Sequence, residues 1–414
     1  MKGTFTIKTY KKLSIIAFLY LSEGIPYGLL FITLSVYFRS NSVELAQIGL
    51  ISLIGLPWSF KAIWAPIIDR FYQRWQWIVF MQLVIALCIL FFANIHIAAL
   101  SFSLWFILII IAIAGATQDI AIDAYSIDIL EPNEQGVANG VRTAAYRIAV
   151  LLSGGLLIAI SSYIEWKNSF YLLSFIFIIM SAIISLNKGF QKPRVQKHII
   201  YDKSNILLYW YIPIKELISR KSAIPVILFI ILFKFGDSMM GQMVSTFWLD
   251  NGFSRKEIGL ISGTLGMVLT ITGALMGGYL TSRLEIPISL WVLGAFQSIS
   301  NLGYAIASYL GAARGYVYSA SFFESFTSGL GTAAFLAFLM RLCKKQFSAT
   351  QYAVLSSFFV IGSRTASAIG GFMAQTYGYT IFFIITFFAS LPAFALLPFV
   401  FKNLSTLSDT TEVK

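Results

Sequence analysis

The stretch FSLWFILIIIAIAGATQDIAIDA, residues 102–124, indicates the fold class of this chain most clearly. It is long enough to cross a bilayer as a helix, which takes about 20 mostly apolar residues. Two carboxylates, Asp119 and Asp123, nevertheless lie inside it. A charge at the centre of a bilayer costs several kcal/mol, so such residues normally face a cavity or each other. The stretch therefore predicts a transmembrane helix with a polar face.

The rest of the chain repeats this pattern. A central polar stretch of about 188–222 divides the apolar windows into six and six. No run of about ten residues alternates between apolar and polar, which argues against a membrane β-barrel. We expect an all-α membrane protein of twelve transmembrane helices, in windows of about 13–38, 44–68, 76–95, 101–127, 138–162, 168–187, 223–248, 256–282, 287–309, 313–340, 347–374 and 378–402.

Composition supports a membrane protein. The 414 residues are 58% hydrophobic and 12% charged, with a mean hydropathy of +0.79. A soluble domain carries roughly twice that share of charge, so a soluble enzyme, a disordered scaffold and a nucleic-acid binder are poor fits. Cys88 and Cys343 lie far apart, and the chain has only two histidines. We therefore expect no disulfide framework, no metal site and no cofactor.

The basic residues predict the orientation. Of the 30 Lys and Arg, 20 lie on the side of the termini and the central loop, and five on the opposite side. Both termini and the central loop are therefore expected in the cytoplasm. We expect a six-helix half at 1–187, a loop at 188–222, a second half at 223–402 and a cytoplasmic tail at 403–414. Within the loop, 206–218 mixes apolar and charged residues, as in an amphipathic helix on the membrane surface.

An internal repeat supports the two halves. The sequence IGLIS occurs at 48–52 and again at 258–262. Gln135, Arg147 and the pair Gly154-Gly155 recur as Gln351, Arg364 and Gly370-Gly371. Two parallel six-helix halves related about the membrane normal describe the major facilitator architecture, in which the ligand site lies near mid-membrane. Matching of Gly-rich apolar helices by composition alone is the alternative. The glycine pairs allow close helix packing.

Nine ionisable residues fall well inside the windows. Six of the nine lie in the first, fourth, seventh and tenth windows, which line the cavity in this architecture. That concentration suits the path of a polar substrate, and no nucleophile–base pair accompanies it. We expect a transporter and not an enzyme; a membrane receptor and a membrane-embedded enzyme are the rivals from other classes. The nine are Glu23, Lys61, Asp119, Asp123, Arg147, Lys234, Asp237, Glu324 and Arg364.

The acidic members are the candidates for proton coupling. Asp119 and Asp123 share one helix face, and two carboxylates so close favour proton binding by one of them. Pairing with Arg142 or Arg147 is the structural alternative. Glu324 has no basic residue within a turn of its own helix. The other two candidates have their own alternatives: Asp237 could be neutralised by Lys234, and Glu23 could be partly exposed.

The basic and neutral candidates are assigned to the substrate. Arg147 and Arg364 could hold substrate carboxylates through bidentate hydrogen bonds, or pair with acidic neighbours. Lys61 could contact an anion or extend toward the cytoplasm. Lys234, Gln118 and Tyr146 complete this set. Gating is assigned to Asp69, Arg70 and Arg74, because an acid at a helix end beside basic residues can latch onto the positive start of another helix.

Six ordered stretches resemble one family, the muropeptide permeases named AmpG. The resemblance spans nearly the whole chain. Its motifs are specific as a set, although each alone is weak. They are IGLIS at 48–52, KAIWAPIIDR at 61–70, ATQDIAIDA at 116–124, KFGD at 234–237, FE at 323–324 with GLGTAA at 329–334, and FSATQY at 347–352.

The resemblance implies proton-coupled import of anhydromuropeptides from periplasm to cytosol across the bacterial inner membrane. It implies as partners a small anionic glycopeptide, protons and membrane lipids, with no nucleic acid, and we expect a monomer. Two features depart from the family: some members carry additional C-terminal helices, and members more often have a small residue at the position of Glu23. Related carriers of acetyl-CoA share parts of the pattern, so another anionic metabolite, such as acetyl-CoA or a nucleotide, is the alternative cargo.

Overall fold

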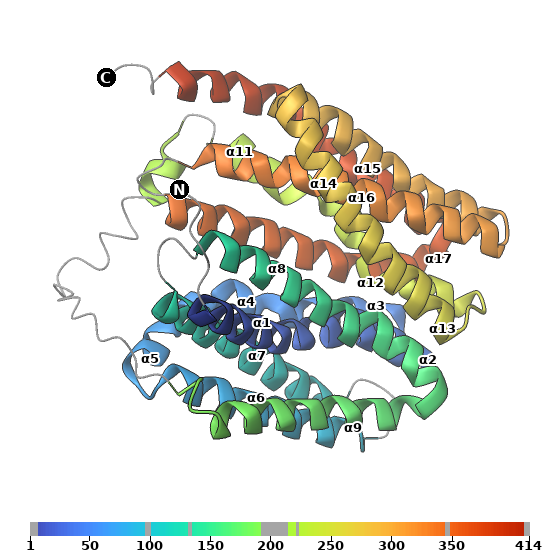
Figure 1. The fold of residues 1–414 in the computed structure, drawn as a ribbon. Helices are drawn as coiled ribbons and strands as arrows, with labels where there is room; N and C mark the ends of the chain where they lie inside the picture. The colour runs from blue at the N-terminus through green and yellow to red at the C-terminus, as the bar shows by residue number, and fades with distance from the viewer. Residues whose placement is uncertain are drawn as a thin grey trace. The chain divides into compact units, whose positions relative to one another are not determined.

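The computed structural model describes residues 7–95, 101–130, 135–191, 214–220, 223–343 and 348–409. Regular structure in these ranges is helical, and they contain no strand (Figure 1). Eight of the described helices are long and apolar enough to cross a membrane. Two of these, Val141–Leu186 and Val354–Phe401, are 46 and 48 residues long. Each contains one residue with non-helical backbone, Glu165 and Gly378, which divides it into two spans.

The elements follow the predicted windows. With the interrupted stretch Leu45–Arg70 and with α15, the long helices account for the twelve transmembrane segments expected from the sequence. The first half contains α1 Ile7–Gly28, α2 Leu34–Ser40, α3 Leu45–Leu50, α4 Leu56–Phe60, α5 Ala65–Arg70, α6 Arg74–Phe92, α7 Phe102–Ile129, α8 Gln135–Leu151 and α9 Leu157–Leu186. The second contains α11 Ala223–Leu232, α12 Phe235–Asp250, α13 Arg255–Glu257, α14 Gly266–Leu284, α15 Ile286–Tyr309, α16 Arg314–Leu342 and α17 Ser348–Asp409.

The second segment is broken, where the sequence window gave one continuous helix. α3, α4 and α5 are joined by tighter 3₁₀ turns at Ile51–Gly55 and Lys61–Ile63. A proline stands in the first turn of both α4 and α5. Proline has no backbone N–H for the preceding turn and its ring crowds that turn, so it begins a helix more readily than it continues one. The break places Lys61 on a turn between two helical pieces.

The chain divides into two compact units. The described residues of Met1–Gln47, Ile54–Lys197 and Gly252–Thr264 form unit 1. Those of Ile48–Leu53, His198–Asn251 and Leu265–Lys414 form unit 2. The expected boundaries at 188–222 and 403–414 stay predictions, because residues 192–213 and 410–414 lie outside the described ranges.

The two short exchanged segments carry the repeated IGLIS motif. In unit 1, a Cβ added to Gly155 would lie 2.6 Å from the carbonyl oxygen of Gly259. In unit 2, a Cβ added to Gly49 would lie 2.8 Å from the Cα of Gly371. Only glycine allows two backbones to approach this closely. The motif glycine of each sequence half therefore packs against the glycine pair of the other half, as internal symmetry requires.

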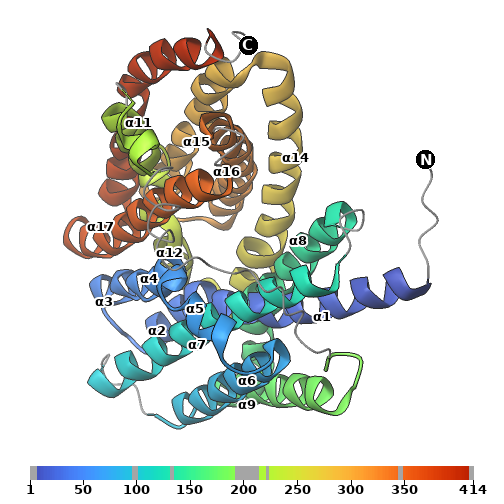
Figure 2. The same cartoon turned by 90° about the vertical axis from the view of Figure 1, so that its left-hand side faces the viewer.

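Aromatic side chains fill the core of each unit. In unit 1, α6 lies against α7 and α9 (Figure 2), and the ring of Phe170 is 4.8 Å from that of Tyr37 and 5.1 Å from that of Phe92. In unit 2, Phe229 is 5.1 Å from Phe338. Tight packing of this kind holds helices together in lipid, where the hydrophobic effect between them is absent.

The end of the central loop packs into unit 2. Leu217 is buried in the unit's apolar core. Beside it, Arg220 Nη1 donates to the carbonyl oxygen of Leu342 at 2.8 Å, and Gln351 Nε2 donates to Glu216 Oε2 at 2.6 Å. Of the segment predicted as an amphipathic helix, residues 214–218 are helical, and 206–213 lie outside the described residues.

Candidate functional site

Unit 1 holds a buried acidic cluster on one face of α7. The two carboxylates of this helix are four residues apart, which places them one above the other. Lys61, from the turn between α4 and α5, lies between them: its Nζ is 3.7 Å from Asp119 Oδ2 and 3.7 Å from Asp123 Oδ2. The break in the second segment thus delivers a cation to the polar face that the sequence predicted.

Asp123 has two further partners on neighbouring helices. Tyr20 of α1 donates its hydroxyl to Asp123 Oδ1 at 2.6 Å. Arg142 of α8 places Nη2 3.2 Å from the same oxygen, and its guanidinium carbon lies 4.8 Å from the centre of the Tyr20 ring. Four parts of the fold therefore meet at one carboxylate.

Glu23 adds a third carboxyl to this cluster. It is 8% exposed, and its Oε2 is buried without a hydrogen-bond partner. Its electrostatic neighbours are Asp119, Asp123, Lys61 and Arg142. These five residues, which we call the first cluster, carry three carboxyl groups and two cations. One carboxyl in the cluster therefore has no cation to balance it.

Hydrogen bonds and a close contact hold the cluster's supporting helices in place. Gln118 donates from Nε2 to Ser22 Oγ at 3.0 Å, which ties α7 to α1. Trp64 donates from Nε1 to Thr117 Oγ1 at 3.1 Å, which ties the second segment to α7. Gly115 leaves room for the indole of Trp58, because a Cβ there would lie 2.8 Å from Trp58 Cζ2. The register of α7 against its neighbours is thus defined by polar contacts as well as by packing.

A cavity of about 480 Å³ adjoins the first cluster inside unit 1. Tyr20, Asp123 and Arg142 supply its charged and polar wall, together with Ser126. The remaining lining is Ile16, Ile127, Leu130 and Ala138. Its size lies within the range of small-molecule sites, roughly 300–1,000 Å³.

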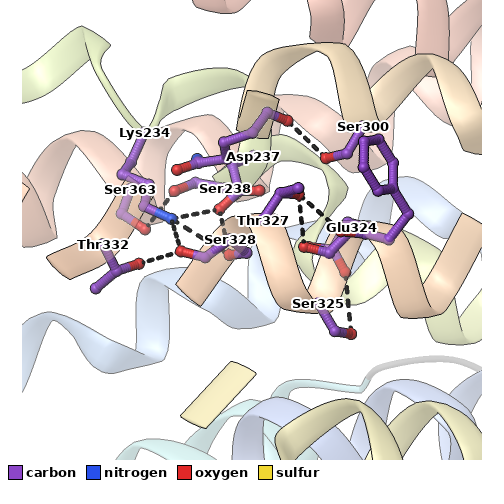
Figure 3. Close-up of polar contacts among 12 residues, drawn as sticks. Lys234, Asp237, Ser238, Ser300, Glu324, Ser325, Thr327, Ser328, Thr332 and Ser363 are labelled. Carbon is purple, nitrogen blue, oxygen red and sulfur yellow. Dashed lines mark hydrogen bonds and ion pairs between the residues drawn. The ribbon is translucent and has the colours of Figure 1, made fainter. Parts of the chain in front are cut away.

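Unit 2 holds a second buried cluster, around the break between α11 and α12 (Figure 3). Lys234 directly precedes the first residue of α12, and its Nζ lies 3.0 Å from Asp237 Oδ2 in the first turn of that helix. Ser328 of α16 joins the pair: its carbonyl and hydroxyl oxygens accept from Lys234 Nζ at 3.2 and 3.3 Å, and its hydroxyl lies 3.2 Å from Asp237 Oδ2. A carboxylate at a helix start is also favoured by the helix dipole.

Glu324 lies one turn along α16 from Ser328. Among the described residues it forms no ion pair, and the hydrogen bond to its side chain comes from Ser325 Oγ at 3.4 Å. Lys234 and Asp237 are its electrostatic neighbours. These three residues form the second cluster, with two carboxyls and one cation. As in the first cluster, one carboxyl is unbalanced.

The other predicted site residues lie apart from these contacts. Arg147 is exposed, and no hydrogen bond or ion pair to it occurs within the described ranges. Tyr146 packs its ring 6.2 Å from that of Tyr27. Arg364 is half-buried on α17 and accepts a hydrogen bond at its carbonyl from Ser52 Oγ at 2.8 Å. Substrate binding by these residues stays a prediction.

Of the predicted gating residues, the structure describes the side chain of Arg74. It is buried, donates from Nη1 to the carbonyl oxygen of Ile68 at 2.9 Å and lies 3.7 Å from Asp128 Oδ2. These contacts connect the start of α6 to the ends of α5 and α7. The side chains of Asp69 and Arg70 lie outside the described part of the chain.

Sequence reasoning did not single out several members of the site. Tyr20, Ser126, Asp128 and Ser328 received no role, and Arg142 was considered only as a partner of the aspartates. The signal for Arg142 was its charge inside an apolar window; the tyrosine and serines have too common a residue type to be recognised without the structure.

Comparison with known proteins defines the class. Residues 14–363 match the model of the Major Facilitator Superfamily. A bacterial homolog of the human lysosomal transporter Spinster, in an inward-facing and unoccupied conformation, superimposes with a TM-score of 0.73 at 15% identity, covering 97% of this chain and 99% of that one. The nucleoside transporter NupG gives a TM-score of 0.70 at 14% identity, covering 95% of this chain and 99% of that one. At these identities the two structures establish the fold.

Sequence relatives narrow the class. The anhydromuropeptide permease of Escherichia coli K12 is 30% identical over 393 residues, covering 93% of this chain and 78% of the permease. Putative transporter AmpG 4 of Rickettsia conorii is 27% identical over 417 residues, covering 97% and 99%. The chain therefore belongs to the Major Facilitator Superfamily and, within it, to the family of AmpG permeases. It is a multi-pass membrane transporter, and its relatives place it in a bacterial inner membrane.

Proposed function

We propose that this chain imports anhydromuropeptides from periplasm to cytosol, driven by protons, through alternating access of its two halves. The observation that carries the proposal is the charge balance of the two clusters. In each cluster the carboxyls, which are buried or half-buried, exceed the cations by one, as counted among the described residues. Each cluster therefore needs one proton to be neutral.

The physical reason for proton coupling is the cost of an unbalanced charge. An ionised carboxylate without a partner is strongly disfavoured in a low-dielectric interior. Binding a proton at Glu324, or within Glu23, Asp119 and Asp123, removes that charge. A loaded, neutral carrier can then change conformation at lower cost than a charged one, and a proton gradient biases that change in one direction.

The substrate assignment rests on the family and on the chemistry of the sites. The relative in Escherichia coli is named an anhydromuropeptide permease. Such ligands combine sugar hydroxyls with peptide carboxylates, and the first cluster offers cations beside hydroxyl and aromatic groups. Lys61, Lys234, Arg147 and Arg364 are the proposed contacts for the carboxylates. The carrier works as a monomer in this proposal, with both termini and the central loop in the cytoplasm.

Uptake into proteoliposomes tests the proposal. The purified chain is reconstituted, and accumulation of a radiolabelled anhydromuropeptide is measured with an inward proton gradient, without one, and with a proton ionophore. Accumulation above the external concentration is expected only with the gradient intact. Gradient-independent equilibration would contradict proton coupling. No uptake by folded protein would contradict the substrate, and phosphorylated and coenzyme-linked ligands would then be tested in the same vesicles.

A further inference from the structure

Arg142 is the most accessible charged member of the first cluster. Its side chain is 44% exposed, against 31% for Lys61 and for Asp123. It lines the 480 Å³ cavity of unit 1, whereas Lys61 does not. Among the described residues the guanidinium contacts one acceptor, Asp123 Oδ1. A guanidinium has five donors in a planar fork, so most of them have no acceptor among the described residues.

We propose that Arg142 binds a carboxylate of the transported ligand in this cavity, and that the ligand and Asp123 compete for its guanidinium. The inference rests on the proposed function, because it concerns how the proposed substrate is recognised. Arg142 would distinguish a ligand that carries carboxylates from one that does not. It also assigns a specificity role to a residue outside the repeat-related pair Arg147 and Arg364.

The cavity has a second feature that fits a ligand. Ser126 lines it, is 6% exposed, and its Oγ is buried without a hydrogen-bond partner. An unused hydroxyl of this kind is costly unless something pairs with it. Ser126 and Arg142 are wall residues of the same cavity. A ligand placing a polar group at Ser126 and a carboxylate at Arg142 would satisfy both.

Competition follows from the groups that face Asp123. These are Tyr20 and Glu23 from α1, Lys61 from the second segment, Asp119 from its own helix and Arg142 from α8. When Arg142 pairs with a ligand carboxylate, the one cation of the cluster left beside Asp123 is Lys61. Its Nζ lies equally close to Asp119, so it balances only one of the two charges. The ligand carboxylate and Asp123 therefore compete for one guanidinium, and removing the charge of Asp123 favours the ligand.

Lys61 is a poorer candidate for the same role. It lies 3.7 Å from both α7 carboxylates, so withdrawing it would leave two charges unpaired instead of one. Arg147 has no carboxylate partner in the described chain, so a ligand bound there would not compete with Asp123. Among the described residues of unit 1, Arg142 is the one cation that lines the cavity, is exposed and pairs with a carboxylate that a ligand can replace.

The test compares a radiolabelled anhydromuropeptide with free carboxylates and the same compound with its peptide carboxyls amidated. Uptake is measured for the wild type, Arg142→Gln, Arg142→Lys and Arg147→Gln, with Arg341→Gln on the exposed end of α16 as control. Arg142→Gln is expected to raise KM for the free-carboxylate compound about 10- to 100-fold, the worth of a charge-assisted pair. It should leave the amidated compound within about twofold, and Arg142→Lys should recover part of the loss.

The competing carboxylate supplies an independent readout. Asp123→Asn removes the charge that competes for Arg142, so it should lower KM for the free-carboxylate compound and leave KM for the amidated compound within about twofold. If Arg142→Gln fails to purify as a folded protein, Arg142→Lys and Asp123→Asn carry the test. An equal loss for both compounds, a selective loss in Arg147→Gln instead, or a KM unchanged in the Arg142 variants would overturn the proposal.

Failure of the proposed function is distinguishable. If the wild type takes up neither compound, the substrate assignment fails, and the dipeptide Ala-Glu and its diamide serve as probes of the cavity in thermal unfolding. Stabilisation by Ala-Glu but not by the diamide, lost in Arg142→Gln, would support the carboxylate site. Absence of that stabilisation in the wild type would overturn it.

Discussion

The second cluster makes an asymmetric prediction for the partners of one ion pair. The side chain of Lys234 is 7% exposed. It forms an ion pair with Asp237 at 3.0 Å and is the cation that acts electrostatically on the neighbouring Glu324. Lys234→Met leaves two buried carboxyls without a cation. Asp237→Asn instead leaves one cation facing one carboxyl, and the amide can still bond to Ser328. The charge balance therefore predicts that losing the lysine is the more harmful change.

The magnitudes follow from the contacts. Removing one partner of a buried ion pair typically costs about 3–5 kcal/mol, and we expect Lys234→Met to lie in that range. The carbonyl of Ser328 stays satisfied in this variant, because Thr332 Oγ1 donates to it at 2.6 Å, so the loss is one of charge balance. Asp237→Asn leaves the second cluster with one carboxyl and one cation, so its charges balance, and the change costs about 1–2 kcal/mol for the lost charge on one hydrogen-bonded group.

The assay is reversible unfolding of the purified protein in mixed detergent micelles. Lys188→Met, at an exposed lysine, is the control and should lie within about 0.5 kcal/mol of the wild type. Because a protonated carboxyl carries no charge, the deficit of Lys234→Met should be smaller at about pH 5 than at about pH 8. A larger loss in Asp237→Asn than in Lys234→Met would refute the charge count, as would a deficit that does not change with pH.

Three further changes test other parts of the account. Glu324→Gln should weaken the pH dependence of uptake while ligand binding stays measurable, because only the first cluster then needs a proton. Glu44→Gln, at an exposed glutamate, is the control, and an unchanged pH dependence would remove Glu324 from the mechanism. Gly115→Ala places a Cβ 2.8 Å from Trp58 Cζ2 and should lower the free energy of unfolding by about 1–3 kcal/mol. Gly303→Ala is the control and should not lower it, because the nearest atom to its Cβ is 3.6 Å away. Equal effects of the two changes would argue against a tight contact at Trp58. Gly259→Ala brings a methyl group against the carbonyl oxygen of Gly155 and should lower both thermal stability and uptake rate. Gly278→Ala is the control, because its methyl group meets nothing within 4 Å. Unchanged stability and uptake in Gly259→Ala would show that the two backbones need not approach so closely.

Hydropathy predicted the helical architecture well because a bilayer demands long apolar helices whose backbone groups are satisfied internally. The interruption of the second segment was not predicted, although prolines in α4 and α5 signalled it. Apolar windows contain no marker of whether a proline begins a new turn or bends a continuous helix. The ends of the apolar windows were correct to within a few residues, because nearly every residue between those ends is apolar. The interiors of the windows were ambiguous for the same reason.

The charged residues were found from the sequence, but their grouping was not. Arg142 and Arg147 are five residues apart, which turns them by about 140° around α8. Arg142 therefore reaches Asp123, and Arg147 does not. In a soluble helix the polar face would reveal which side is buried. In lipid both faces are apolar, so the sequence gives no rotation for the helix, and the partners of Asp123 emerge only from the packed structure.

In the proposed mechanism, each cluster requires a proton to be neutral. It is tested most directly by proton flux in lightly buffered proteoliposomes with no imposed gradient. Adding an anhydromuropeptide outside should raise the external pH as ligand enters, and the ionophore should abolish that signal. Ligand uptake with no change in external pH would contradict the account, since the cargo would then cross without the protons that the buried carboxyls require.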